Sequence, residues 1–206
     1  ASLSQTQLQG LTSSDISELA TTQISALTAT QLSLLTTTQV DGLSQRQVSA
    51  LSTTQVGILS RTQLASFTAT QFSSLPYTAM QALSTTQTAA LPATLMGAIN
   101  SLQLRALSPE QIASLSATQI AAIPCTALKG MTATQCAVLT ATQLAAFSTS
   151  QVPYLSVEAT AALDESQLAT LSTTQFASFS TAQIKSLQPA QLASLPQTLI
   201  TALTSG

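Results

Sequence analysis

The sequence predicts an all-α solenoid, a superhelix of very short capped helices with one helix for every eight residues. A large apolar residue recurs every eight residues from Leu3 to Leu203, with no insertion or deletion. A Ser or Thr usually follows it, and a Gln usually stands three residues further on. We number the positions of each octad from this apolar residue, so that Leu3 is at position one. Self-similarity at a fixed period is typical of repeat architectures.

Positions one and six carry the predicted core. Position one is large and apolar in all 26 octads, and position six is apolar in 23 of 25, the exceptions being Thr88 and Thr160. Charged residues avoid both positions, whereas every Phe and every Met lies at one of them. We therefore expect these two positions to face the core, and the other six to face solvent, cap helices or pack closely.

Positions two and five form a helix-start pattern. Position two is Ser, Thr, Asn or Asp in 20 of 26 octads, and position five is Gln in 19 of 25. In a capping box, the hydroxyl of the first residue accepts from the backbone N–H three residues on, and the Gln side chain accepts from the N–H of the first residue. The apolar residues at positions one and six are placed to close a hydrophobic staple around this box.

The octads that carry proline test this interpretation. Proline has no N–H for a Gln side chain to bind, so Gln is dispensable where proline stands at position two. Gln is absent from all four of these octads, whose residues at positions two and five are Pro76 and Ala79, Pro92 and Leu95, Pro124 and Ala127, and Pro196 and Leu199. Only two other octads lack it, at Asp15 and Ala159. This correlation favours a helix that restarts in every octad.

Other architectures fit the period less well. In one long helix the apolar stripe drifts by about 80° per octad, and the prolines break it. In a β-solenoid, core spacings of five and three put successive core residues on opposite faces of a strand. A β-solenoid and an irregular arrangement remain the alternatives to short helices.

A single octad cannot fold alone. A six-residue helix is about 9 Å long, and its nucleation cost exceeds its gain, so it must pack against its neighbours, as in a solenoid. We expect one continuous array over residues 1–206, with no separate domains and with two or three octads per superhelical turn. The glycines at positions seven and eight are expected to ease the helix end, and a small residue at position eight lets adjacent turns approach closely.

Composition excludes several function classes. Charged residues are 6% of the chain, the net charge is −2, and there is no His. These values leave no basic surface for nucleic acid and no imidazole base. Apolar runs are too short to span a membrane. We predict no enzyme activity, no catalytic residue, no cofactor and no metal site, and we do not expect a small-molecule ligand.

Four candidate groups for chemistry have a structural interpretation that we favour. A Ser–Lys pair is conceivable at Lys129 or Lys185. Asp164 and the adjacent Glu165 resemble a carboxylate site, but they lie at the N-cap and in the first turn of a predicted helix. Cys125 and Cys136 are 11 residues apart, which gives neither a disulfide framework nor a zinc site. We expect one surface thiol and one core thiol, while a disulfide depends on geometry.

The predicted surface is rich in hydroxyl groups and poor in charge. Thr occupies position four in 16 of 25 octads, which forms either an uncharged solvated face or an array that orders water or carries O-linked sugars. With few charges, little repulsion keeps copies apart. Neither end carries a polar capping repeat, which solenoids normally need. We therefore expect a fragment of a longer array or a subunit that associates with itself, end to end or laterally.

The segment from Leu51 to Leu59, Leu-Ser-Thr-Thr-Gln-Val-Gly-Ile-Leu, and the segment from Leu171 to Phe179 resemble tandem Leu-Thr-Thr-x-Gln-Val/Ile-x-Ala-Leu repeats of large bacterial secreted and cell-surface proteins. The resemblance extends from Leu3 to Leu203, and the proline octads depart from it. It implies an extracellular, adhesin-like or filamentous role. Superhelices of short helices in proteins such as mesothelin and stereocilin are a more distant similarity.

The sequence thus favours an extracellular or cell-surface structural protein, as a subunit or segment of a filament, fibre or surface stalk. The alternative is an adhesin-type binding module that uses its Thr, Ser and Gln-rich face to hold glycan, ice or a protein. An enzyme or carrier is the third hypothesis, and the composition argues against it.

The capped-helix interpretation predicts the effect of removing one cap. Ser116→Ala is expected to lower the free energy of unfolding by about 1 kcal/mol, because the N–H three residues on loses its acceptor. Urea melts measure this change. A control, Thr173→Ala, alters a residue one position after a cap and should be neutral or slightly stabilising. Equal melts for Ser116→Ala and the unaltered chain would contradict capping.

Overall fold

The computed structural model describes residues 4–204, and its regular structure there consists of 24 α-helices and one 3-10 helix, with no strand. The chain forms two compact units, Ala1–Ile99 and Asn100–Gly206. The octad phase continues through the boundary, since Ile99 is at position one and Asn100 at position two. The predicted fold class, a solenoid of short helices, is confirmed.

The first unit contains twelve helices among its described residues. They are α1 (Gln5–Gln9), α2 (Ser13–Glu18), α3 (Thr21–Ser25), α4 (Ala29–Ser33), α5 (Thr37–Asp41), α6 (Gln45–Ser49), α7 (Thr53–Gly57), α8 (Arg61–Ala65), α9 (Ala69–Ser73), α10 (Tyr77–Ala82), α11 (Thr85–Ala89) and α12 (Ala93–Met96).

The second unit repeats the pattern and includes the 3-10 helix. Its elements are α13 (Ser101–Ala106), α14 (Pro109–Ala113), α15 (Ala117–Ala122), α16 (Cys125–Leu128), α17 (Ala133–Ala137), α18 (Ala141–Ala145), η1 (Val152–Tyr154), α19 (Val157–Ala161), α20 (Glu165–Ala169), α21 (Thr173–Ala177), α22 (Thr181–Ser186), α23 (Pro189–Ala193) and α24 (Gln197–Thr204).

Each helix begins where the capping pattern predicts. At α15, the Ser116 hydroxyl accepts from the Gln119 N–H at 3.2 Å, and Gln119 Oε1 accepts from the Ser116 N–H at 2.8 Å. Ser116 itself is extended, with φ −73° and ψ 161°. At Ala20, which has no side-chain acceptor, only the second of the two bonds forms, from the Ala20 N–H to Gln23 Oε1. The capping box is confirmed where both residues are present, whereas α10, α12 and α16 begin after a proline without a side-chain cap bond.

One octad departs from the prediction of an α-helix in every repeat. Ser148 and Gln151 still form the reciprocal bonds at 3.2 and 2.8 Å, but turns and the 3-10 helix η1 follow them. Pro153 stands in this segment and has no N–H to donate to the carbonyl four residues earlier. The octad therefore keeps its cap and its core residues while losing the α-helical turn.

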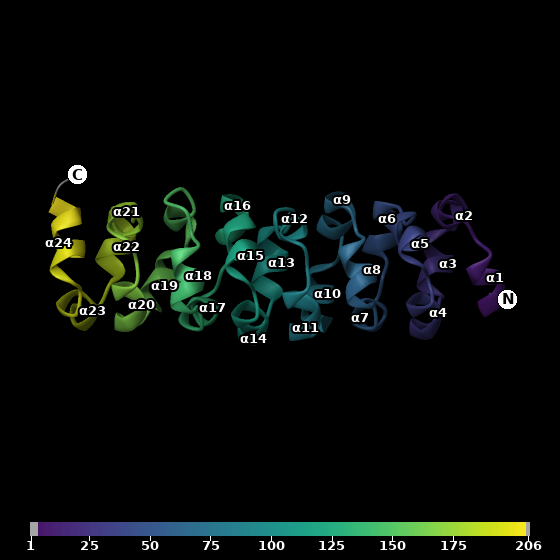
Figure 1. The fold of residues 1–206 in the computed structure, drawn as a ribbon, viewed down its shortest axis with the longest axis horizontal. Coiled ribbons are helices and arrows are strands. Elements are labelled where there is room, and N and C mark those ends of the chain that lie inside the picture. The colour runs from purple at the N-terminus through teal and green to yellow at the C-terminus, as the bar shows by residue number, and fades with distance from the viewer. Residues whose placement is uncertain (1–3, 205–206) are drawn as a thin grey trace. The chain divides into compact units, whose positions relative to one another are not determined.

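Helices pack against the third helix after them, as α3 does with α6 and α4 with α7. In the first unit α6, α9 and α12 consequently form a row along its upper edge (Figure 1). Contacts between successive turns join residues 25 to 31 apart, from Ser25 with Ala50 to Gln39 with Leu8. Helices that pack on one another are three octads apart. This agrees with our expectation of two or three octads per turn, which sequence periodicity alone did not narrow further.

The core of each unit is built from positions one and six, as predicted. Leu43 and Val48 in the first unit, and Leu139 and Leu144 in the second, are buried. The two Thr exceptions at position six are also buried. The Thr88 and Thr160 hydroxyls each donate to a carbonyl four residues earlier at 3.0 Å, so that burial leaves no orphaned polar group.

The glycines lie at helix ends, as expected, and some of them also allow close packing. Gly10, Gly42 and Gly97 are the C-cap residues of α1, α5 and α12, and no described glycine has a positive φ. A Cβ on Gly42 would lie 2.5 Å from the Ser13 carbonyl oxygen, and one on Gly130 would lie 2.0 Å from that of Ser101. At these two sites of position eight, the predicted close approach of adjacent turns is confirmed.

This approach predicts that Gly130→Ala lowers the free energy of unfolding by about 1–3 kcal/mol or more, because the backbone of the adjacent turn must move. Gly10→Ala is the matched control, since its Cβ would meet only its own helix at 3.5 Å or more. Chemical denaturation of both variants provides the comparison. Similar stability for the two would argue against tight packing at Gly130.

Candidate functional site

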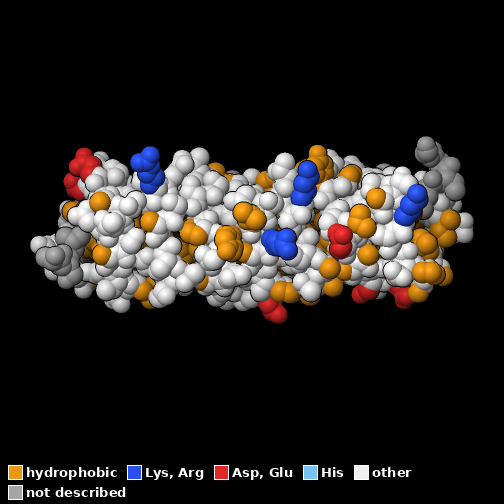
Figure 2. Space-filling view, turned by 180° about the vertical axis from the view of Figure 1, so that it is seen from behind, with side chains coloured by type: hydrophobic (Ala, Val, Ile, Leu, Met, Phe, Trp, Pro, Cys, Tyr) orange, Lys and Arg blue, Asp and Glu red, His pale blue; other side chains and the backbone are white. Residues whose placement is uncertain are grey.

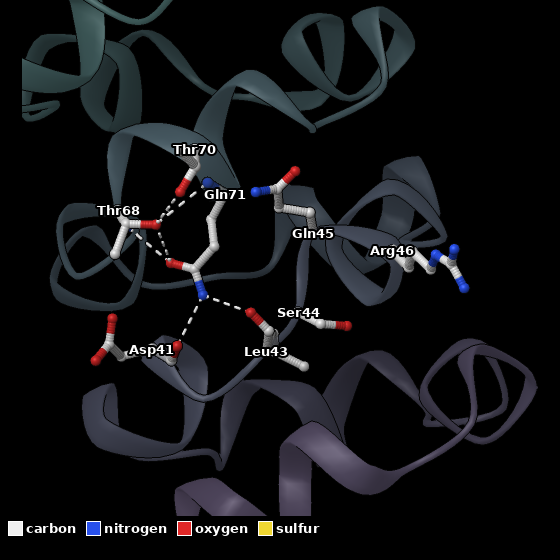
Figure 3. A pocket seen from close by; sticks show the side chains of 8 residues that line it. All are labelled: Asp41, Leu43, Ser44, Gln45, Arg46, Thr68, Thr70 and Gln71. Carbon is white, nitrogen blue, oxygen red and sulfur yellow. Dashed lines mark hydrogen bonds between the residues drawn. The ribbon is translucent and has the colours of Figure 1, made fainter.

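The most specific polar arrangement in the structure is formed by the Gln at position five. Gln71 is representative: its Oε1 accepts from the Thr68 N–H at 2.7 Å and from the Thr68 hydroxyl at 3.0 Å. Its Nε2 donates to the carbonyls of Asp41 at 2.8 Å and Leu43 at 2.7 Å, in the preceding superhelical turn (Figure 3). One amide therefore caps its own helix and holds the turn below. We call this arrangement the glutamine clamp.

The glutamine clamp recurs through both units. In both units, Nε2 of glutamines at position five donates to carbonyls 28 to 31 residues earlier. These glutamines include Gln39, Gln47, Gln55, Gln63, Gln71 and Gln87, and Gln135, Gln143, Gln151, Gln167, Gln175, Gln183 and Gln191. These side chains are buried, although the octad pattern predicted that position five lies outside the core.

The sequence pattern predicts only half of the role of this Gln. The reciprocal bond at the helix start was predicted, but the second bond joins residues about three and a half octads apart, which no local pattern reveals. A usable signal was present, because Gln has a donor as well as an acceptor, whereas Glu would serve the cap alone. The recurrent choice of Gln indicated that its N–H₂ group has a partner.

A hollow of about 560 Å³ lies beside Gln71, between two turns of the first unit. Asp41, Ser44, Gln45, Arg46 and Thr68 are among its lining residues. The Arg46 side chain extends away from the other lining residues (Figure 3). Gln71 and Thr68 are committed to capping and to the glutamine clamp, so this hollow offers hydroxyls and a single carboxylate at an open surface.

A second hollow, of about 340 Å³, brings Lys129 and Arg105 near Ser156 and Glu158 in the second unit. The Lys129 ammonium lies 5.5 Å from the centre of the Tyr154 ring, a cation–π geometry. The Ser156 hydroxyl accepts from the Ala159 N–H at 3.1 Å and caps α19. The candidate Lys129 is therefore held against an aromatic ring. Lys185, the other candidate, is an exposed residue in the last turn of α22.

Asp164 and Glu165 act at a helix start, as predicted. The Ser166 hydroxyl and the Gln167 N–H donate to the Asp164 carboxylate at 2.6 and 2.7 Å, and hold its pKa below the ordinary value of 3.8. A depressed folded pKa means that this cap stabilises the fold above about pH 4, and that its contribution is lost as the pH falls through the folded pKa. Glu165 is exposed in the first turn of α20.

The two thiols separate into one core and one partly exposed group, as predicted. Neither Cys125 nor Cys136 forms a disulfide. Burial raises the pKa of Cys136 to about 12. The Cys125 thiol lies 3.4 Å from the Ser150 carbonyl oxygen of a neighbouring turn. Within residues 4–204, no group of three or more His, Cys, Asp or Glu side chains could hold a metal ion.

The Thr residues at position four form pairs of hydroxyls with the N-caps. Thr68 and Thr70 lie 3.1 Å apart in the first unit, and Ser172 and Thr174 lie 3.0 Å apart in the second. The same pair occurs at Ser60 and Thr62, Ser84 and Thr86, Ser116 and Thr118, Thr132 and Thr134, and Ser148 and Ser150. These side chains are exposed or half-buried, and they recur as uncharged hydroxyl pairs at the surface of both units.

Comparison with known proteins supports a tandem repeat region. The ALTTAQ repeat family model matches residues 96–124 and 160–197. No curated protein matches the chain. None of the helices in the described part of the chain combines the length and the apolar character needed to cross a membrane.

The glutamine clamp predicts a pH-dependent effect of Gln143→Glu. The amide Nε2 donates to the Ile112 and Leu115 carbonyls at 2.8 Å each, and a carboxylate would place negative charge against both oxygens. We expect a loss of about 3–5 kcal/mol at pH 7, as for an uncompensated buried charge. The loss should shrink near pH 4, because the folded pKa of this Glu is raised and the protonated form is favoured.

Gln81→Glu supplies the control for this experiment, since Gln81 is exposed on α10. It should change the free energy of unfolding by less than about 0.5 kcal/mol at either pH. Urea melts of the two variants and of the unaltered chain, at pH 4 and at pH 7, give four differences in the free energy of unfolding. A pH-independent loss at Gln143, or equal losses at both sites, would show that the amide donor does not hold the adjacent turn.

The burial of Cys136 predicts its reactivity. At pH 8 a thiol reagent should label Cys125 in the folded chain, while Cys136 stays protonated and shielded, because the thiolate is the nucleophile. In a Cys125→Ala variant, labelling should therefore require denaturant. Rapid labelling of that variant without denaturant, measured by mass spectrometry, would show that the core opens around α17.

Proposed function

We propose that this protein is a structural repeat protein that works outside the cell, as a subunit or segment of a filament, fibre or surface stalk. The glutamine clamp is the observation that carries this proposal. It uses a recurring polar side chain to fix one turn to the next, as in the Gln55 bonds to Ile24 and Leu27 at 3.1 and 2.8 Å. A protein that extends along one axis needs the same connection between each turn and the next, with the donor always on the later turn and the acceptor on the earlier one.

The surface supports the same proposal. Charged side chains appear as isolated spots on a mainly uncharged face (Figure 2), consistent with 6% charged residues and a net charge of −2. Low charge removes the repulsion that keeps soluble proteins apart. Association of many copies, or of several arrays, therefore carries little electrostatic cost.

Electron microscopy of the purified chain over a concentration series tests this function. Uniform fibres with a regular axial repeat are expected if the chain is a filament subunit. Isolated particles at every concentration would remove the filament and fibre roles and leave the stalk. A stalk then requires that the native protein be found at the cell surface, and an intracellular location, established by fractionation, would overturn the proposal.

The paired hydroxyls favour a second candidate, a binding module. Pairs such as Ser84 with Thr86 at 2.9 Å recur at the uncharged surface, and hydroxyl groups both donate to and accept from sugars or ordered water. Glycan-array binding and inhibition of ice recrystallisation test this role. A variant in which Thr70, Thr86 and Thr174 are replaced by Val should lose either activity while keeping its stability.

A further inference from the structure

The hollow of about 340 Å³ in the second unit lies beside two irregular octads. Lys129 and Arg105, both at position seven, line it together with Glu158. In the octads that lead into it, Pro124 replaces the hydroxyl at position two, and Pro153 stands in the 3-10 helix η1. Departures from an otherwise consistent pattern are expected at functional sites, so this hollow is a candidate for one.

Packing between turns brings these side chains to the hollow. Arg105 lies in α13 and Lys129 is the C-cap of α16, three octads later, and the two helices pack on one another. The 3-10 helix η1 packs on α16 in turn, and its Tyr154 is the only aromatic residue at position eight of any octad. The Lys129 ammonium lies 5.5 Å from the centre of this ring, so the ring holds the cation beside the hollow.

The charged side chains of the hollow are the groups that remain for a ligand. The Thr132 and Ser156 hydroxyls accept from backbone N–H groups three residues on, at 3.3 and 3.1 Å, and are committed to capping. Within residues 4–204, Arg105 and Lys129 form no ion pair, and both are exposed. Hydrogen bonds from its own backbone N–H and from the Ser156 hydroxyl hold the pKa of Glu158 below its ordinary value, so this carboxylate is charged at neutral pH.

A neighbouring hollow of the second unit has the same position in the repeat but different chemistry. It measures about 310 Å³ and is lined by residues that each follow their counterparts by one octad. Ala137 stands there in place of Lys129, and Asp164, in place of Ser156, is itself a cap. The stacking of turns therefore supplies the hollow, whereas the residues at position seven give the first hollow its positive charge.

The size and charge of the hollow select one class of ligand. Its volume of about 340 Å³ is within the range of small-molecule sites, about 300–1,000 Å³, and exceeds what a sulfate or phosphate ion fills. Two cations favour a carboxylate, while Glu158 repels a bare divalent anion and accepts hydrogen bonds from hydroxyl groups. A sugar ring that carries one acid group meets both conditions.

We infer that this hollow binds one unit of an acidic glycan, with the sugar carboxylate between Arg105 and Lys129 and the ring hydroxyls donating to Glu158. Tyr154 is a positioning residue, because it acts through Lys129. This inference rests on the second function proposed above, the binding module, and names the ligand class of one site. The site does not include the hydroxyls of Thr70, Thr86 and Thr174, so the two sets of residues can be tested separately.

Isothermal titration calorimetry of the 206-residue chain with a galacturonate trisaccharide tests the inference. Lys129→Ala and Arg105→Ala should each weaken binding about tenfold or more in Kd, because each removes a charge-assisted hydrogen bond. Lys185→Ala is the matched control, since Lys185 is also an exposed lysine at position seven and lies outside the hollow. It should leave the Kd unchanged. All three side chains are exposed, so circular dichroism should show the variants folded.

The positioning role of Tyr154 has its own comparison. Tyr154→Leu should weaken binding of the trisaccharide about threefold, because Lys129 loses the aromatic ring that holds it. Tyr154→Phe keeps the ring and should restore the original Kd. A loss in Tyr154→Phe equal to that in Tyr154→Leu would contradict this role.

Further titrations at equal ionic strength separate the ligand classes. A neutral galactose trisaccharide should bind about tenfold or more weakly than its acidic counterpart, because it lacks the carboxylate. Glu158→Ala should weaken binding of the galacturonate trisaccharide and strengthen binding of inorganic sulfate, since the carboxylate accepts hydroxyl groups and repels anions. Galacturonate as a monosaccharide should bind no more tightly than the trisaccharide if the hollow admits a glycan chain.

Several outcomes would overturn the inference. They are no binding of the galacturonate trisaccharide, equal binding of the neutral one, binding of the monosaccharide alone, sulfate binding that Glu158→Ala leaves unchanged, and an equal loss in Lys185→Ala. A glycan-array signal that the combined Thr70→Val, Thr86→Val and Thr174→Val variant removes would then leave the binding module standing on its paired hydroxyls. An array without any signal would remove the binding module together with this site.

Discussion

The amide of the Gln at position five links the two levels of this fold. Its oxygen accepts a backbone N–H that a helix start leaves without a partner, and its nitrogen donates to carbonyls of the preceding turn. The first bond stabilises the start of a five-residue helix by satisfying a backbone N–H. The second bond joins that helix to the preceding turn. A five-residue helix is unstable alone, so local and tertiary structure depend on the same side chain.

The proline octads show the limit of this arrangement. Proline at position two removes the N–H that Oε1 would accept, so a Gln there would bury an unsatisfied oxygen, at a cost of about 1–3 kcal/mol. Ala79, Leu95 and Ala127 replace it and are buried. These apolar side chains join the core in place of the amide.

The regular use of polar groups also shapes the proposed function. Hydroxyls at position two cap helices, hydroxyls at position four pair with them, and the amides at position five hold adjacent turns. Asp164 is likewise a cap, with a depressed pKa set by its donors. The recurring polar residues of this chain thus stabilise the fold. This use of polar groups favours a mechanical or scaffolding role, which depends on the length and continuity of the array rather than on one binding or catalytic site.

The sequence by itself determined the fold class, the octad phase, the core positions one and six, the caps and the separation of Cys125 from Cys136. Each of these follows from periodicity, or from side-chain chemistry acting within about one octad. The tertiary structure decided the number of octads per turn, the burial of Gln at position five, the packing role of Gly42 and Gly130, and the 3-10 turn at Pro153. The long-range contacts among these join residues 25 to 31 apart, and their geometry depends on how whole turns stack.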